Sequence, residues 1–552
     1  MGKKKLRAID LYSGVGGWSL GLRMAGINVV ASYERWGMAN ETNFKNNRHQ
    51  AQTVDIRRLS LDELPTDIQI VVGSPPCTQF SYSNRGGNGD IADGLKDIIK
   101  FLTIVDYLKP KVWAMENVPR VAEILEQELL PGGCLRKFKH LNLKSHIVNM
   151  EEFGLPQKRQ RCIAGNFDFE LLESYKSATH KCTLGKVIKA LAKKKIVDPI
   201  YGIEMDRADL RDHVTERALN SEEERINMAS KTLHPVYNAM SFPDRLDRSV
   251  RTITATCTRV SRESIVIEDP TIPNSYRRLT VRERACLQGF PITFQFYGSS
   301  YGHKLRMVGN AVPPLFSYFV GQALQQRAAE KISALSTHAE SLRAPVPPAE
   351  DASPDKPGAH FPKTRTFRFA IPSLRLKSGV RFDLANVVRK DRVDWAVEFY
   401  FGTPKSIQSI DLAALSLSAV LSRIPMAISA QVHSELEKVS QFVCNADIGN
   451  MQRVWSHNGV GLTRPFMLLD ELDERGSEMV KLLMPYERLT QELVGNVLLD
   501  TYGAEAIKLP GLLKLANNAA LILAGLIIGA TTNAALIKHP QKAAILLARA
   551  AA

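Results

Sequence analysis

One cysteine of this chain is placed where it could act as a nucleophile. Cys77 follows two prolines in GSPPCTQFS (residues 73–81), directly after an apolar run. The prolines lock their φ angles and so hold the turn in one shape, and a thiolate on such a turn can attack an electron-poor carbon. The alternative is a buried structural cysteine, which the glycine-rich SYSNRGGNGD that follows makes less favoured. We therefore expect Cys77 to be a nucleophile and residues 80–93 to form a lid over the substrate.

A carboxylate and two arginines could serve the same site. Glu116 opens ENVP after a further apolar run, so its carboxylate can reach the edge of a sheet on which Cys77 lies. QKRQR (residues 157–161) runs into the strand-like CIAGNF, and in an extended segment Arg159 and Arg161 project to the same face. The alternative for this run is a solvated basic strand.

A glycine-rich turn predicts a nucleotide-type ligand at the same edge. DLYSGVGG (residues 10–17) follows the first apolar run and opens a helix, so its backbone can approach a ligand and offer N–H groups. Glu34 ends the second apolar run, where a carboxylate can accept ribose hydroxyls. Asp55 with Ile56 could pair with an adenine edge. Taken singly, the turn could be an ordinary one, Glu34 a solvated charge and Asp55 the end of a strand.

Alternating strands and helices must position these residues. Apolar runs predict buried strands at residues 7–11, 29–33, 70–72 and 112–115, and periodic stretches predict helices at residues 18–25, 95–108 and 121–130. This rhythm is typical of βαβ units with a mainly parallel sheet, in which ligands lie at the carboxyl ends of the strands. It is lost over residues 171–275, and helical patterns return at residues 278–288 and 313–331.

The composition is that of a globular protein with a polyanionic partner. Of 552 residues, 44% are hydrophobic and 23% charged, which excludes a wholly disordered or fibrous chain. A net charge of +15, located mostly in the first 330 residues, favours nucleic acid before membrane. Seven scattered cysteines contain no CxxC or Cys/His cluster, so we expect no metal, no disulfide framework and a reducing cytoplasm.

The order of these motifs resembles that of the DNA (cytosine-5) methyltransferases over about residues 6–330. YSGVGG is similar to that family's first S-adenosylmethionine motif, with Tyr12 where phenylalanine is more usual. The turn around Cys77 is similar to the nucleophile motif, with Thr78 in place of the commoner glutamine. ENV and the QxRxR pattern match two further motifs.

Three downstream segments extend the resemblance. RTITAT (residues 251–256) resembles the end of a target-recognition region, and RLTVRERACLQGFP (residues 278–291) the motif that supports it. GNAVPP (residues 309–314) resembles the last motif, which returns to the catalytic domain beside the cofactor.

The resemblance implies an α/β fold of the S-adenosylmethionine-dependent methyltransferases, with a Rossmann-like mixed sheet, a smaller target-recognition domain and an extra C-terminal α+β region. The implied boundaries are 1–170 for the catalytic domain (completed by about 300–330), 171–277 for target recognition and 278–299 for the supporting segment.

The resemblance also implies two sets of binding residues. The cofactor, S-adenosyl-L-methionine without a metal, would contact Tyr12, Ser13, Gly14, Gly16, Gly17, Glu34, Arg35, Asp55, Ile56, Pro75, Leu95, Asn310 and Ala311. Double-stranded DNA would contact Ser81, Arg85, Gln157, Arg251, Thr254 and Arg259.

The implied chemistry is methylation of cytosine. Cys77 would attack C6 of a cytosine flipped out of the duplex, because a stacked base cannot be reached. Glu116 would hold N3 and the exocyclic amine, and Arg161 with Arg159 the base O2 and the nearby backbone. C5 would then take the methyl group, giving 5-methylcytosine after loss of the C5 proton and release of Cys77.

Two alternatives stay open. A branch of the same family methylates tRNA, although the long span between Arg161 and Arg278 leaves room for a substantial recognition domain. A non-catalytic DNA-binding relative would be expected to lack Cys77, Glu116 or the arginines, all of which are present. By resemblance we expect a cytoplasmic protein of bacterial or phage origin, with a cognate restriction endonuclease as a further potential partner.

The C-terminal part is less informative. Residues 338–364 are rich in proline, alanine and charge and are interpreted as a linker, and residues 365–552 as an accessory domain that begins with strands and continues with helices. Residues 515–537 carry no charge and could span a membrane. Polar residues leave an apolar core at residues 519–530, a length that suits a buried helix better, so no membrane contact is expected.

Overall fold

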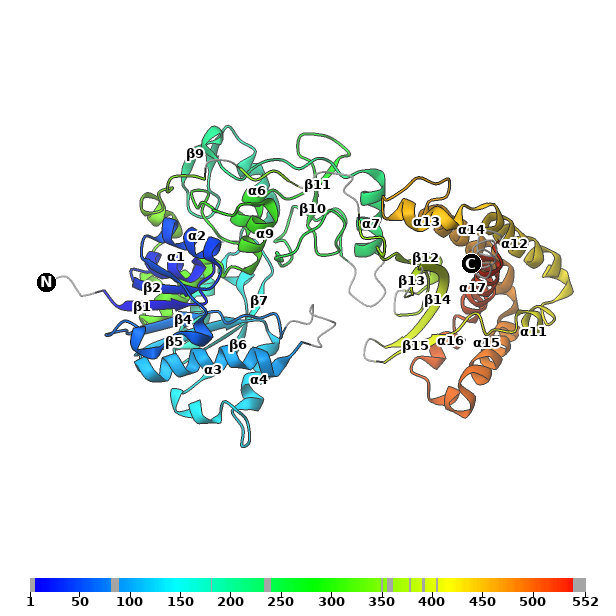
Figure 1. Cartoon of the computed structure of the whole chain (residues 1–552), viewed down its shortest axis with the longest axis horizontal. Helices are drawn as coiled ribbons and strands as arrows, with labels where there is room; N and C mark the ends of the chain where they lie inside the picture. Colours follow the sequence, from blue (N-terminus) through cyan, green and yellow to red (C-terminus); the bar gives the residue numbers. More distant parts are fainter. Residues whose placement is uncertain are drawn as a thin grey trace, which may run out of the picture. The chain divides into compact units, whose positions relative to one another are not determined.

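The structure, a computed structural model, describes residues 5–80, 89–179, 181–232, 240–348, 351–354, 361–376, 379–389, 393–403 and 406–539. It divides into two compact units (Figure 1). The first consists of Met1–Glu224 and Ser241–Asp355, and the second of Arg225–Met240 and Lys356–Ala552.

A seven-stranded mixed sheet forms the centre of the first unit. Its strand order is β3-β2-β1-β4-β5-β7-β6, in which β7 is antiparallel to both neighbours and the other pairs are parallel. The strands are β1 Arg7–Leu11, β2 Asn28–Glu34, β3 Gln50–Thr53, β4 Ile70–Gly73, β5 Val112–Asn117, β6 Lys144–Asn149 and β7 Gln160–Gly165. The four predicted strands are β1, β2, β4 and β5, and the predicted α/β fold with a Rossmann-like mixed sheet is confirmed.

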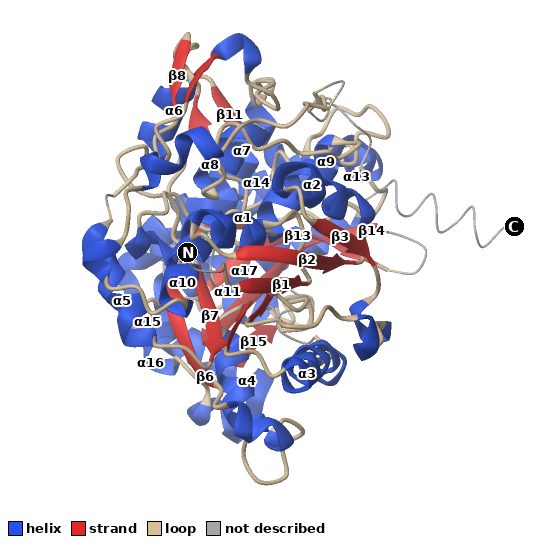
Figure 2. Ribbon diagram, turned by 90° about the vertical axis from the view of Figure 1, so that its left-hand side faces the viewer, coloured by secondary structure: helices blue, strands red, loops and turns tan. Residues whose placement is uncertain are grey.

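Helices cover both faces of this sheet (Figure 2). Trp18 and Phe316 belong to the core on one face, and Phe101 and Leu125 to the core on the other. The helices of this layer are α1 Gly17–Met24, α2 Gly37–Asn47, α3 Ile91–Leu108, α4 Arg120–Glu128, α5 Phe169–Ser174 and α10 Pro314–Leu324. A Cβ at Gly21 would collide with α10, so glycine is what lets α1 and α10 pack closely.

In the described residues between α5 and α10, short strands and helices of up to 12 residues replace the regular alternation, whose loss over residues 171–275 the sequence predicts. They are α6 Leu184–Leu191, β8 Lys195–Val197, β9 Glu204–Asp206, α7 Ser221–Thr232, β10 Val266–Glu268, β11 Tyr276–Arg278, α8 Val281–Leu287 and α9 Tyr301–Asn310. The helix predicted at residues 278–288 begins later, because Arg278 ends a strand and Thr280 forms a capping box with Glu283. The helix predicted at residues 313–331 ends at Leu324.

Residues 338–348, predicted to belong to a linker, pack against the first unit instead. Leu342 is only 2% exposed, and the ring of His338 lies 5.3 Å from that of Tyr318. The hydroxyl of Tyr297 donates to the carbonyl of Val346. Several contacts thus hold this stretch on the first unit, although its composition is typical of a linker.

The second unit combines an antiparallel sheet with helices. Its strands follow the order β12-β13-β14-β15 and are Arg368–Arg375, Arg381–Val388, Val393–Thr403 and Ser406–Ile410. Its helices are α11 Leu417–Leu421, α12 Met426–Asn445, α13 Ile448–Trp455, α14 Pro465–Leu483, α15 Glu487–Tyr502, α16 Leu512–Ala516 and α17 Ala519–Lys538. Strands followed by helices agree with the α+β organisation expected for this region.

Helix α17 lies at the centre of the second unit. It packs against β14, α12, α14 and α15. The ring of Phe382 fills the place of a side chain at Gly525, and Asn533 donates to and accepts from the backbone of Val397. Among the described residues, α17 alone is long and apolar enough to cross a bilayer, and 67% of its most apolar window is buried in the protein. These contacts favour the interpretation as a buried helix.

Candidate active site

Three strands bring the predicted catalytic residues together. Cys77 follows β4, Glu116 lies near the end of β5, and Arg161 lies at the start of β7. Strand β7 runs antiparallel to β5 and pairs Ile163 with Glu116, so the side chain of Arg161, two residues earlier, can reach the carboxylate. Arg161 Nε lies 3.0 Å from Glu116 Oε1. The reversal of strand direction at β7 therefore places a cation beside the carboxylate.

The turn that carries Cys77 is held from several sides. Asn117 Nδ2 donates to the Pro75 carbonyl at 3.0 Å, and Trp18 Nε1 donates to Ser74 Oγ at 3.0 Å. The Phe80 N–H donates to the Cys77 carbonyl at 3.0 Å, which closes the turn. No role for Asn117 is predicted from the sequence, although its position directly after Glu116 in the matched motif was a usable signal.

Charged groups surround the thiol of Cys77. The residue is exposed to solvent. Even so, neighbouring protein atoms desolvate the thiol, and this burial together with the charge of Glu116 raises the pKa of Cys77 above its ordinary value. The charges of Arg161 and Arg159 act in the opposite direction. The site thus presents an exposed cysteine, with a thiol of raised pKa, beside an ion pair.

Arg159 lies behind the site rather than in it. Its side chain is 2% exposed, and its two terminal nitrogens donate to the carbonyls of Ile253, Gly309 and Ala311 at 3.2–3.3 Å. Burial and the charge of Arg161 lower the pKa of Arg159 to about 9. Arg159 therefore holds two loops together, and the expectation that it grips a base is replaced by a positioning role.

Gln157 is buried as well. Its Oε1 accepts from the Ile253 N–H at 2.7 Å, and its Nε2 donates to Gln288. The loop that contains Ile253 is held further by Arg284, which donates to the Thr254 carbonyl at 2.6 Å. A residue with no exposed surface cannot contact DNA in this conformation, so the predicted DNA contact of Gln157 is corrected to support of this loop.

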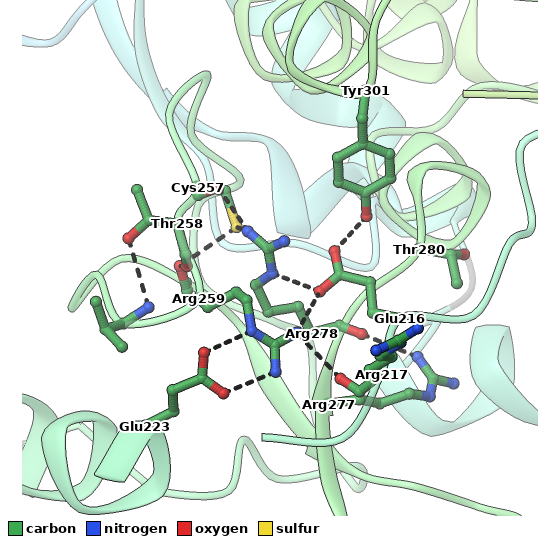
Figure 3. Close-up of polar contacts among 12 residues, drawn as sticks. Glu216, Arg217, Glu223, Cys257, Thr258, Arg259, Arg277, Arg278, Thr280 and Tyr301 are labelled. Carbon is green, nitrogen blue, oxygen red and sulfur yellow. Dashed lines mark hydrogen bonds and ion pairs between the residues drawn. The ribbon is translucent and has the colours of Figure 1, made fainter. Parts of the chain in front are cut away.

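The arginines of the recognition region are also engaged within the protein. Arg259 forms an ion pair with Glu223, Nε to Oε1 at 2.6 Å, and donates to two carbonyls (Figure 3). Beside it, the buried carboxylate of Glu216 accepts from Arg278 Nε at 2.6 Å and from the hydroxyl of Tyr301. Arg251 pairs with Asp244 and donates to backbone carbonyls.

These contacts give Arg251 and Arg259 partners within the protein, and their DNA contacts stay predictions. Thr254, by contrast, is partly exposed, with its hydroxyl bonded to the Thr256 carbonyl. The other two predicted DNA contacts, Ser81 and Arg85, lie outside the described residues.

The glycine-rich loop has room for a ligand. Gly14 and Gly16 adopt φ angles of +53° and +88°, a region that favours glycine. A Cβ on Gly14 would meet open space, whereas one on Gly17 would collide with the carbonyl of Val312. The hydroxyl of Ser13 is buried without a hydrogen-bond partner in the described residues. An open loop with an unused hydroxyl fits a polar ligand.

A carboxylate adjoins this loop. Glu34 accepts from the N–H groups of Gly14 at 3.0 Å and Trp36 at 2.8 Å, which fixes it at the end of β2. Two N–H donors leave further lone pairs on the carboxylate for ligand hydroxyls. Arg35, next to it, is exposed.

The remaining predicted cofactor residues differ in exposure. Asp55 is exposed and caps a short 3₁₀ helix, Ile56–Arg58, by accepting from the Arg57 N–H. Asn310 is exposed, whereas the other four are buried: Ile56, Pro75, Leu95 and Ala311. Within the described residues, no group of three or more His, Cys, Asp or Glu side chains could hold a metal ion.

Comparison with known proteins places this geometry in context. The family model "C-5 cytosine-specific DNA methylase" matches residues 6–326. The chain is 29% identical over 352 residues to the Type II methyltransferase M1.HphI of Haemophilus parahaemolyticus, covering 58% of this chain and 86% of that protein. It is 29% identical over 327 residues to M.MthTI of Methanothermobacter thermautotrophicus, covering 55% and 92%. The solved structure of the S. pombe Dnmt2 methyltransferase aligns with 58% of this chain and 99% of its own at a TM-score of 0.41 and 18% identity.

Proposed function

Because this chain belongs to the C-5 cytosine-specific DNA methylase family and is a DNA (cytosine-5) methyltransferase, we propose that it methylates a flipped-out cytosine in a specific DNA sequence. The reaction would proceed through a covalent bond between Cys77 and C6 of the base. The observation that carries this proposal is the exposed Cys77 on a braced turn, beside the ion pair of Glu116 with Arg161.

The first step activates C5, which is a poor nucleophile in free cytosine. The Cys77 thiolate forms a bond to C6, and the displaced electron pair makes C5 electron-rich. As the Cys77–C6 bond forms, N3 takes up a proton, and the Glu116 carboxylate accepts hydrogen bonds from this N3–H and from the exocyclic amine, which stabilises the charge that develops on the ring. After C5 has gained the methyl group, its proton leaves as the Cys77–C6 bond breaks, which restores the thiolate and the aromatic ring.

Arg161 supports this chemistry in two ways. Its Nε holds the carboxylate of Glu116 in place, and its Nη1 donates to the Gln160 carbonyl. Its charge also opposes the rise in the pKa of Cys77, which favours formation of the thiolate. We propose that the remaining donor of Arg161 contacts the base O2.

The loop of residues 12–17 fits S-adenosylmethionine, which supplies an electrophilic methyl group when bound. The open face of Gly14 and the unused hydroxyl of Ser13 support this assignment. Glu34 would bind the ribose hydroxyls, and Asp55 with Ile56 would bind the adenine.

The substrate side of the proposal rests on charge and on family membership. The basic excess of the chain suits DNA, and removing a base from the stack costs a few kcal/mol, which phosphate and base contacts would offset. We propose a role in host or phage DNA protection inside the cell, alone or with a cognate restriction endonuclease. Type II methyltransferases are among its relatives.

The test is methyl transfer from labelled S-adenosylmethionine to unmethylated plasmid DNA and, separately, to tRNA. Bisulfite sequencing of the DNA product should show protected cytosines in one short repeated sequence. Label in tRNA alone, or no protected cytosine from protein that binds the cofactor, would contradict the proposal.

A further inference from the structure

We infer that Arg57 and Asp97 are positioning residues that connect the cofactor loop to the nucleophile turn, with the Tyr12 hydroxyl as a third member of the network. The inference rests on the proposed function, because it takes the loop of residues 12–17 as the place where S-adenosylmethionine binds. It assigns a role to side chains that the proposed chemistry does not use.

Arg57 clamps two carboxylates of one helix. It follows Asp55 and Ile56 directly, and its Nε and Nη2 donate to the two oxygens of Asp97 at 3.0 and 2.7 Å. Its Nη1 donates to Asp93 Oδ1 at 2.9 Å. This bidentate geometry fixes direction as well as charge. The side chain of Asp97 is only 8% exposed, so solvent screens the pair less than a surface ion pair.

Tyr12 joins the same carboxylate from the glycine-rich loop. Its hydroxyl donates to Asp97 Oδ1 at 3.2 Å. Burial and the charge of Asp97 hold the pKa of Tyr12 well above its ordinary value, so the hydroxyl stays a donor. A phenylalanine, the more usual residue at this place in the motif, could not make this bond.

The helix held by Arg57 also carries the nucleophile turn. Asp93 and Asp97 lie in the first two turns of α3, and between them Gly94 faces the ring of Phe80, where a Cβ would come within 2.6 Å. Phe80 is fully buried, and its N–H donates to the Cys77 carbonyl at 3.0 Å. The first turns of α3 thus form the surface on which the Cys77 turn rests.

A continuous set of contacts therefore leads from the cofactor residues to the nucleophile. Cofactor bound against Tyr12 and Asp55 restrains Arg57 and the Tyr12 hydroxyl, these restrain Asp97 and the start of α3, and α3 restrains the Cys77 turn. The expected consequence is that cofactor binding steadies the start of α3 before any DNA is bound.

Hydrogen–deuterium exchange of the full chain tests this without DNA. Saturating S-adenosylhomocysteine, with binding checked by calorimetry, should slow exchange several-fold at the backbone amides of residues 91–98 in the wild type. Arg57→Gln should remove most of this slowing. Arg58→Gln is the matched control, since it makes the same change in a neighbouring side chain that is 88% exposed, and it should retain the slowing.

Tyr12→Phe provides a second variant that keeps the ring and loses only the hydroxyl. It should retain cofactor binding and show weaker slowing at residues 91–98, and its kcat should fall more than its KM for S-adenosylmethionine changes. Equal slowing in all variants, or none in a wild type saturated with the ligand, would overturn the inference. Failure of the wild type to bind the ligand would instead refute the cofactor assignment of the proposed function.

Discussion

The proposed active site around Cys77 and the ionic cluster around Glu216 both contain a glutamate paired with an arginine, and they differ in how completely their groups are used within the protein. In the cluster, Glu216 is 4% exposed and accepts from Arg278 and Tyr301, while Arg259 is bound by Glu223. At the proposed active site, Cys77 is exposed, the Glu116 and Arg161 side chains of the ion pair are 8% and 15% exposed, and the charge of Arg159 also acts on the thiol. Ion pairs that satisfy each other in the interior keep a shape, whereas an exposed thiol beside such a pair is accessible to a substrate.

The largest expected effect is the loss of turnover when Cys77 of the proposed active site is replaced. Cys77→Ala removes the group proposed to form the covalent bond, so methyl transfer should fall by at least about a thousandfold. DNA binding, measured by fluorescence anisotropy, should remain close to that of the wild type. Turnover comparable to that of the wild type would show that methyl transfer does not require the Cys77 thiol.

In the cluster the main effect should be on stability. Glu216→Gln removes the buried carboxylate that pairs with Arg278 and should lower the free energy of unfolding by about 3 kcal/mol. Urea unfolding of the full chain, followed by circular dichroism, measures the change. Glu41→Gln, which breaks an exposed ion pair with Lys45, is the control and should cost less than about 1 kcal/mol. Equal changes for the two variants would remove the distinction between saturated and exposed charges.

The dependence of turnover on pH tests the protonation state of Cys77 at the proposed active site. Because burial and Glu116 raise the pKa of Cys77, the thiolate is the minor form at neutral pH and its fraction grows as the pH rises. Where thiolate formation limits the rate, turnover should increase by up to about tenfold per pH unit from pH 7 towards 9. Single-turnover rates at saturating substrates measure it. A rate that is flat or falls over this range would contradict the assignment.

The smallest effect is expected for an arginine that is already engaged. Arg251 is bound to Asp244 and to backbone carbonyls, so Arg251→Gln should leave the salt dependence of DNA affinity nearly unchanged. A phosphate contact would reduce the slope of log affinity against log salt by about one. A reduction of that size would return Arg251 to the DNA interface.

The sequence predicts elements and motif positions better than it predicts the direction of long side chains. Apolar runs locate β1 and β4 closely, because a strand covered on both faces needs such a run. Arg159 and Arg161 carry the same side chain two residues apart, yet one reaches a carboxylate and the other three carbonyls of loops distant in sequence. Only the tertiary packing of those loops decides which partner each arginine finds.

The linker predicted at residues 338–364 shows a second limit of prediction from sequence. Composition predicts a linker at residues 338–364, but Leu342 finds a buried place on the first unit. A single packed side chain is invisible to an average over composition. Networks such as that of Tyr12, Arg57 and Asp97 are missed because their members are far apart in sequence, and no local pattern shows that the three side chains meet.

The central place of α17 has a consequence for the order of folding during synthesis. The sheet of the second unit is translated well before α17. Its residues Phe382 and Val397 contact Gly525 and Asn533 of that helix, which are synthesised later. Until α17 emerges from the ribosome, this unit cannot complete its core. The first unit waits longer, since Gly21 of α1 packs against Ser317 of α10, 296 residues later, whereas Gly525 follows Phe382 by 143 residues. Each unit stays incomplete until its last packing helix is made, so the methyltransferase part, whose two packing segments are further apart along the chain, should be the part most in need of chaperones during synthesis.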